Sequence, residues 1–183
     1  MKTNHGITCL LAPALLLAGC LMGPVAAKAL DSGGSVDVTK LLGEAKAEAV
    51  ELLRDAEDLE SYTKSRLSWE SHAMKIGMVK EHVNNTGKLL RKLRDAEVTG
   101  SPWQQTAIKR IEPLLKELAA NIETTINHLN ENKARIHLSE FQEYVRANYE
   151  MAVNLEALIR DFVNYGEAKQ EFERLGQKLG VVD

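Results

Sequence analysis

Apolar residues recur every three or four positions along most of the chain, which is the period of an α-helix with one buried face. Four long segments show this pattern, and short polar or glycine-containing stretches separate them. Long amphipathic segments joined by short loops bury their apolar faces by packing around one shared core. The sequence therefore predicts an all-α fold, an antiparallel up-down-up-down four-helix bundle with coiled-coil-like, heptad-spaced seams. The predicted seams run through Val38, Leu42, Ala45, Ala49, Leu52, Ala56 and Leu59; through His72, Ile76, Val79, Val83, Thr86, Leu90 and Leu93; through Ile108, Ile111, Leu115, Leu118, Ile122, Thr125 and Leu129; and through Phe141, Val145, Asn148, Ala152, Leu155, Ile159 and Phe162.

Local signals place the first helix boundaries. A polar stretch over residues 60–65 follows the first seam, and we favour a turn there over one continuous helix. The clearest start signal is Ser101 followed by Pro102 and Gln104, which combines proline at the first helical position with the spacing of a capping box. The third helix is therefore expected to begin at Pro102.

Two further signals bound the fourth helix. Ser139 and Gln142 repeat the capping-box spacing and predict its start. Tyr165–Gly166 predicts its end, because glycine is common just after a helix. A short C-terminal amphipathic helix is expected to follow, with Phe172, Leu175 and Leu179 on its apolar side.

Residues 1–29 have the layout of a secretory signal peptide: Lys2, an apolar run, and small residues before a cleavage site after Ala29. The apolar run from Ile7 to Met22 is shorter than the ~20 residues that a retained membrane span requires. The stretch that ends in Cys20, Leu-Ala-Gly-Cys, also resembles the lipobox of bacterial lipoproteins, which implies acylation of Cys20 as the alternative. Residues 30–36 are predicted to be a flexible leader, and residues 37–183 a single bundle domain.

Composition narrows the function classes. Aromatic residues make up 5% of the 183 residues, and helix-forming residues dominate, which disfavours a β-sandwich or barrel. The net charge is -3 and no basic stripe is present, so nucleic acid is not an expected partner. Both cysteines, Cys9 and Cys20, lie in the predicted signal peptide. The predicted mature chain therefore lacks thiols for disulfides, zinc-thiolate sites or cysteine nucleophiles.

The chain carries no motif that specifies catalysis. Glu-x-x-His pairs, G-x-S-x-G and H-E-x-x-H do not occur in the sequence, so we expect a non-enzymatic protein without a cofactor. The helical register brings His72, His128 and Glu140 to one end of the bundle, with His137 and Asp55 nearby. Such a set is the basis for an alternative hypothesis, a metal- or small-ligand-binding bundle.

The second helix also has apolar residues on a second face. Leu67, Met74, Met78 and Leu89 lie roughly opposite its main seam. Either the first helix covers them, or they form a surface for self-association or an unknown protein partner. Our principal hypothesis is an exported bundle, periplasmic, envelope-associated or extracellular, that acts through its surface. It would contact the membrane only through a lipid on Cys20.

Overall fold

The computed structural model describes residues 35–181. Four helices and two short 3-10 turns follow one another in this part of the chain. The predicted cleavage site at Ala29 and the predicted lipidation site at Cys20 lie outside the described residues. The elements are α1 (Val36–Thr63), α2 (Trp69–Asp95), η1 (Glu97–Thr99), α3 (Pro102–Glu131), η2 (Lys133–Arg135) and α4 (Ser139–Leu179).

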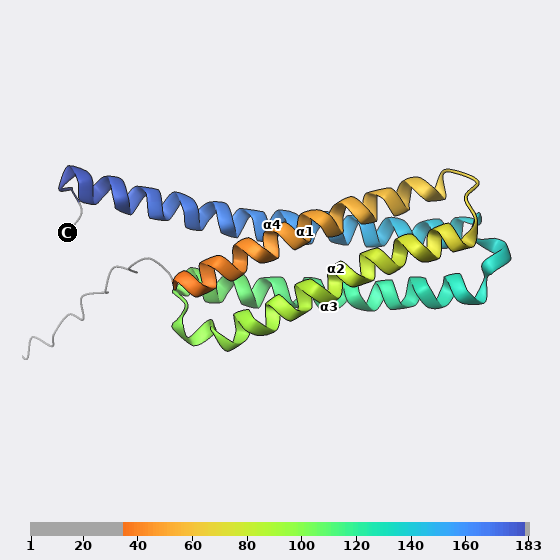
Figure 1. Cartoon of the computed structure of the whole chain (residues 1–183), viewed down its shortest axis with the longest axis horizontal. Helices are drawn as coiled ribbons and strands as arrows, with labels where there is room; N and C mark the ends of the chain where they lie inside the picture. Colours follow the sequence, from red (N-terminus) through yellow and green to blue (C-terminus); the bar gives the residue numbers. More distant parts are fainter. Residues whose placement is uncertain (1–34, 182–183) are drawn as a thin grey trace, which may run out of the picture. The chain divides into compact units, whose positions relative to one another are not determined.

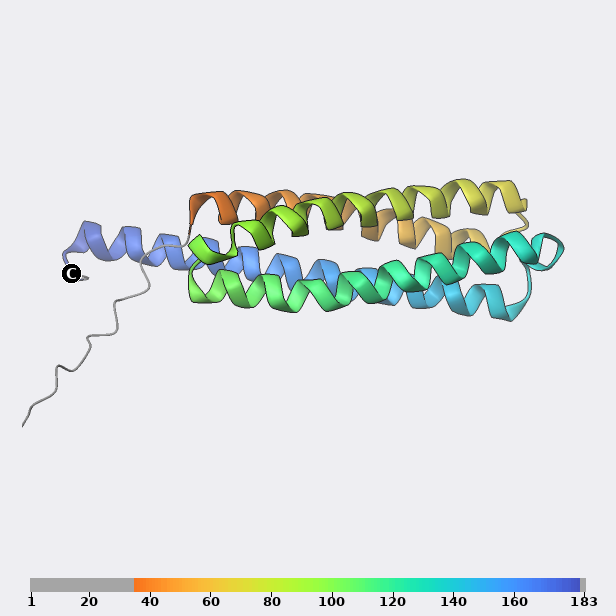
Figure 2. The same ribbon diagram turned by 90° about the horizontal axis from the view of Figure 1, so that it is seen from below.

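The helices form the predicted up-down four-helix bundle. Each helix packs against its neighbours in the chain, and α1 also packs against α4, which closes the bundle (Figure 1). The turn expected after the first helix is confirmed, since residues 64–68 separate α1 from α2. A view at right angles shows two layers, α1 with α2 above α3 with α4 (Figure 2).

The predicted seams form the core. Every seam position of α1, α2 and α3 is buried, and so is every seam position of α4 except the half-buried Phe162. Two polar seam residues pair between helices: the Asn148 side chain donates to the Thr125 hydroxyl oxygen at 2.8 Å, and Asn121 donates to Asn148 at 2.8 Å. Burial of these amides is therefore compensated by hydrogen bonds between α3 and α4.

A buried glutamine joins the start of α1 to the start of α3. The predicted capping box is confirmed: Gln104 Oε1 accepts from the backbone N–H of Ser101 at 2.9 Å, and the Ser101 side chain accepts from the backbone N–H of Gln104. Gln104 Oε1 also accepts from the Ser35 N–H at 2.9 Å, and Gln104 Nε2 donates to the Thr39 hydroxyl at 2.9 Å. The prediction that α3 begins at Pro102 is confirmed.

The second predicted capping box is wrong. Ser139 is already the first residue of α4, and Leu138 occupies the N-cap position. Gln142 instead donates to the backbone carbonyl of Thr63 at 3.3 Å, at the last turn of α1. Gln142 therefore serves a contact between two helices and not a local cap.

The predicted end of the fourth helix at Tyr165–Gly166 is also wrong. α4 continues without a break to Leu179, so the C-terminal amphipathic segment is the last third of α4 and not a separate helix. Gly166 is buried because α4 passes against Trp103 there: a Cβ on Gly166 would lie 2.6 Å from Cη2 of the indole. The glycine meets a packing requirement within the helix, and α4 ends at Gly180 in the left-handed conformation.

Candidate functional site

The last part of α4 extends beyond the rest of the bundle. α4 has 41 residues, whereas α1, α2 and α3 have 28, 27 and 30. Figures 1 and 2 both show α4 continuing past the start of α1 and past the turn between α2 and α3. We call residues 166–179 the α4 extension; at 1.5 Å per residue it is about 20 Å long.

The α4 extension carries exposed apolar side chains in a heptad pattern. Tyr165, at its base, is 53% exposed, Phe172 is 69% exposed and Leu179 is 68% exposed, and these three are seven residues apart. Ala168 and Leu175 take the intervening heptad positions, and Leu175 is 40% exposed. Apolar residues in alternating steps of three and four are what a helix presents to a second helix in a coiled coil.

Charged residues flank this apolar stripe. Glu171 and Lys178 each precede an apolar a position, which places them at the g positions of the two heptads. Glu171 forms hydrogen bonds with Arg174 one turn later, at 2.7 and 2.8 Å. These bonds lower the pKa of the Glu171 carboxyl below its ordinary value. The carboxyl is therefore ionised at neutral pH, as interhelical ion pairing requires.

Aromatic packing fixes the base of the α4 extension. The Trp103 ring meets the Tyr165 ring edge-on, with 5.5 Å between centroids, and also covers Gly166. Trp103 belongs to the first turn of α3, whose start is tied to α1 through Gln104. The α4 extension therefore leaves the bundle from a well-packed base in a defined direction.

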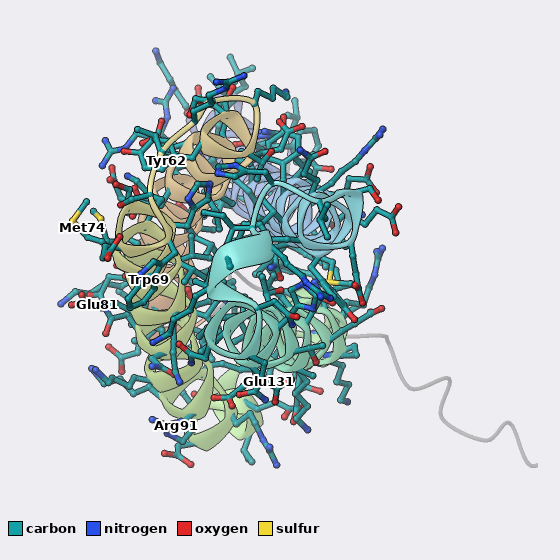
Figure 3. The ribbon with its side chains drawn as sticks, turned by 90° about the vertical axis from the view of Figure 1, so that its right-hand side faces the viewer. Tyr62, Trp69, Met74, Glu81, Arg91 and Glu131 are labelled. Atoms are coloured by element: carbon teal, nitrogen blue, oxygen red, sulfur yellow. The ribbon has the colours of Figure 1, made fainter. Side chains whose placement is uncertain are left out.

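The predicted partner surface on the second helix is only partly exposed. Met74 and Met78 are 62% and 39% exposed, and the Met74 side chain points away from the bundle (Figure 3). Leu67 lies in the loop before α2, and Leu89 packs against the core. Helix α1 therefore does not cover Met74, and a role for these four residues in binding a partner stays a prediction.

The described residues hold no group of three His, Asp, Glu or Cys side chains suited to a metal ion. His72 and His128 do approach one end of the bundle, but both rings contact Phe141, at centroid distances of 5.5 and 6.3 Å. His72 Nδ1 donates to the Ser68 carbonyl at 2.9 Å, while its buried Nε2 has no hydrogen-bond partner in this part of the chain. His137 is exposed. His72 and His128 therefore belong mainly to an aromatic cluster around Phe141, and His137 does not join them.

A chain of ionic contacts joins α1 to α2. Lys75 Nζ lies 3.2 Å from Asp55 and 2.9 Å from Asp58. His82 Nδ1 lies 2.7 Å from Glu48, and His82 Nε2 lies 3.3 Å from Asp55 Oδ2. Asp55 is 2% exposed, so these contacts offset the cost of burying its carboxylate.

This ionic cluster was not anticipated, although its spacing is visible in the sequence. Glu48 and Asp55 are seven residues apart on α1, and Lys75 and His82 are seven apart on α2. Each stands one position before a seam residue, which places it at the edge of the interface between the two helices. Acidic residues seven apart on α1 and basic residues seven apart on α2 can pair across the interface of two adjacent helices. This equal spacing is the signal in the sequence that predicts the pairs. Because Lys75 compensates Asp55, the cluster fixes the register of α1 against α2.

The chain matches no protein family model, no curated protein and no solved structure. None of the described helices is both long enough and apolar enough to cross a membrane.

Proposed function

We propose that this protein is an exported, non-enzymatic helical bundle of the cell envelope that self-associates through the α4 extension. The observation that carries the proposal is the exposed heptad stripe of Tyr165, Ala168, Phe172, Leu175 and Leu179, on the part of α4 that extends past the other three described helices (Figures 1 and 2). A helix of this length is marginal in water on its own and gains stability by packing its apolar face. A second copy provides a matching face.

An antiparallel arrangement of the two copies suits the charges. In an antiparallel pair, each a position faces a d position, so Phe172 of one copy meets Leu175 of the other. The same register brings Ala168 opposite Leu179. Glu171 of each copy then lies near Lys178 of the other, whereas in a parallel pair the g position of Glu171 would face an e position of the other copy, Gly176, which offers no charge. Opposite charges beside an apolar seam favour the antiparallel orientation.

The proposed location follows from the N-terminal sequence. The signal-like features of residues 1–29 support export, and acylation of Cys20 would hold the bundle at a membrane surface. The bundle core consists of residues between Val38 and Ile159. Pairing through the α4 extension would therefore link two folded bundles end to end without disturbing either core.

Sedimentation velocity of the predicted mature chain, beginning at Leu30, tests the proposal over a range of concentrations. We expect concentration-dependent dimers for the native sequence and monomers for the double substitution Phe172→Glu and Leu175→Glu. Val98→Glu is the matched control, because Val98 is 90% exposed and belongs to η1, outside the heptad stripe. Capture of a different protein by a monomeric chain would reject self-association.

A further inference from the structure

A groove with a volume of about 450 Å³ lies between α2 and α3. These two helices contact each other less than any other neighbouring pair in the bundle. The residues of α2 that line the groove run from Val83 to Arg94, about 17 Å along the helix axis. This volume falls within the range of ~300–1,000 Å³ that is typical of small-molecule sites.

Small residues on both helices create the groove. Gly87 on α2 and Ala119 on α3 both line it. A Cβ added to Gly87 would meet open space, since its nearest neighbour, Nη1 of Arg91, lies 4.0 Å away. Three core side chains are reached through this opening: Val83, Leu90 and Leu115 are 5%, 7% and 5% exposed, the highest values among the buried apolar residues. The floor of the groove is therefore apolar.

Cations surround this apolar floor. Lys88, Arg91, Arg94 and Lys116 line the groove, together with one carboxylate, Glu112. Glu112 is shared by two of them, at 3.0 Å from Arg94 and 2.7 Å from Lys116. The excess of positive charge contrasts with the net charge of -3 of the whole chain.

Two of the cations lack an acidic partner in the described part of the chain. Lys88 donates to the neutral side chain of Asn85 at 2.9 Å. Arg91 makes no hydrogen bond or ion pair within residues 35–181, and its guanidinium lies over Gly87 at the middle of the groove. A guanidinium presents several donors in a fixed plane and suits a carboxylate or phosphate group.

We propose that the groove between α2 and α3 binds a single-chain anionic amphiphile, with its hydrocarbon chain on Val83, Leu90 and Leu115 and its anionic headgroup at Lys88 and Arg91. The elongated apolar floor fits one extended chain, and the unpaired cations at its edge fit one negative headgroup. A purely apolar ligand would not pair with the charges of Lys88 and Arg91. A small anion would not cover the apolar floor. The inference does not depend on self-association through α4.

Isothermal titration calorimetry with decanoate and decanol, a matched pair that differs in headgroup charge, tests this site on the predicted mature chain. We expect decanoate to bind once per chain and more tightly than decanol. Replacing both Lys88 and Arg91 by Gln should weaken decanoate binding by roughly tenfold or more and leave decanol unchanged. Gly87→Leu fills the groove and should abolish binding of both ligands.

Two control variants separate the groove from general surface effects. Gly77→Leu places the same side chain on an exposed glycine of α2 with nothing within 4 Å, and it should bind decanoate as the native chain does. Lys64→Gln removes a cation near the opposite end of α2 and should also leave binding unchanged. The Phe172→Glu, Leu175→Glu chain should retain decanoate binding, so a failure of self-association is distinguishable from a failure of this inference.

Other results would overturn the proposal. Undetectable decanoate binding, or unchanged binding by a folded Gly87→Leu variant, would exclude the groove as the site. Inorganic phosphate binding as tightly as decanoate would indicate a simple anion site. Binding to phosphatidylglycerol vesicles without binding to monomeric decanoate would indicate a membrane-facing surface instead.

Discussion

Gly166 lies directly against the indole of Trp103, and a Cβ at this position would approach the ring to 2.6 Å from Cη2 and 3.0 Å from Cζ2. The indole also packs edge-on against Tyr165. This contact joins the first turn of α3 to the base of the α4 extension. It allows α4 to pass close to Trp103 and continue beyond the bundle.

Gly166→Ala should therefore destabilise the fold, although alanine is the better helix former. The added methyl group requires the ring or α4 to move, and overpacking of this kind costs about 1–3 kcal/mol. Gly77→Ala is the matched control, because its Cβ meets nothing within 4 Å; it should stabilise α2 by about 0.5–1 kcal/mol. Urea unfolding measures both changes, and two stabilised variants would disprove the packing role of Gly166.

The second prediction concerns how much Lys75 stabilises the fold and how this stabilisation depends on pH. Burial lowers the pKa of the Lys75 ammonium, but its hydrogen bonds to Asp58 and Asp55 outweigh burial and raise the pKa above its ordinary value of 10.5. The folded state therefore holds this proton more tightly than the unfolded state. The resulting stabilisation is complete below pH 10.5 and is lost as the pH rises through the folded-state pKa.

Lys75→Met measures this contribution. At pH 7 we expect a loss of about 3 kcal/mol, because buried Asp55 loses its ammonium partner. The stability difference between the native chain and Lys75→Met should shrink as the pH is raised from 9 to 11.5. Lys64→Met, which removes an exposed lysine paired with Glu60, should change stability by less than about 1 kcal/mol. A difference that stays constant across this pH range would contradict the assigned role of the ammonium.

Gln104→Ala should loosen the start of α1 before the rest of the bundle. The substitution removes acceptors and donors used by Ser35, Thr39 and Ser101, and we expect a loss of about 2 kcal/mol. Hydrogen exchange should accelerate most at the first turn of α1, which Gln104 ties to α3. Gln170→Ala, on the exposed α4 extension, is the control and should leave exchange in α1 unchanged. Uniform acceleration throughout the bundle would argue against a local role.

The bundle could be predicted from the sequence because seam burial depends on helical period alone. Every seam position from Val38 to Ile159 is buried, and Ser101 with Pro102 correctly placed the start of α3. The wrong predictions concern residues whose role depends on a contact with another helix and not on their own sequence neighbours. Gly166 looked like a helix end, whereas it makes room for Trp103 from another helix.

The candidate surfaces were less predictable. The groove at Gly87 depends on which α3 residue faces it, and pairs such as Lys75–Asp55 depend on the register of α1 against α2. Neither follows from the period of a single helix. The α4 extension does not follow from the sequence for a related reason: Gly166 resembles a helix boundary, which separates the apolar residues after it from the fourth helix.

Disulfide trapping between two single-cysteine chains tests self-association through the α4 extension most directly. The predicted mature chain contains no cysteine, so Ala168→Cys and Leu179→Cys each introduce one thiol. Mild oxidation of an equal mixture should give mainly the mixed disulfide, because antiparallel pairing brings position 168 of one copy opposite position 179 of the other. Val98→Cys measures random collision. A yield no higher than that of Val98→Cys, or a preference for disulfides between two Leu179→Cys chains, would contradict the antiparallel pairing of the α4 extensions.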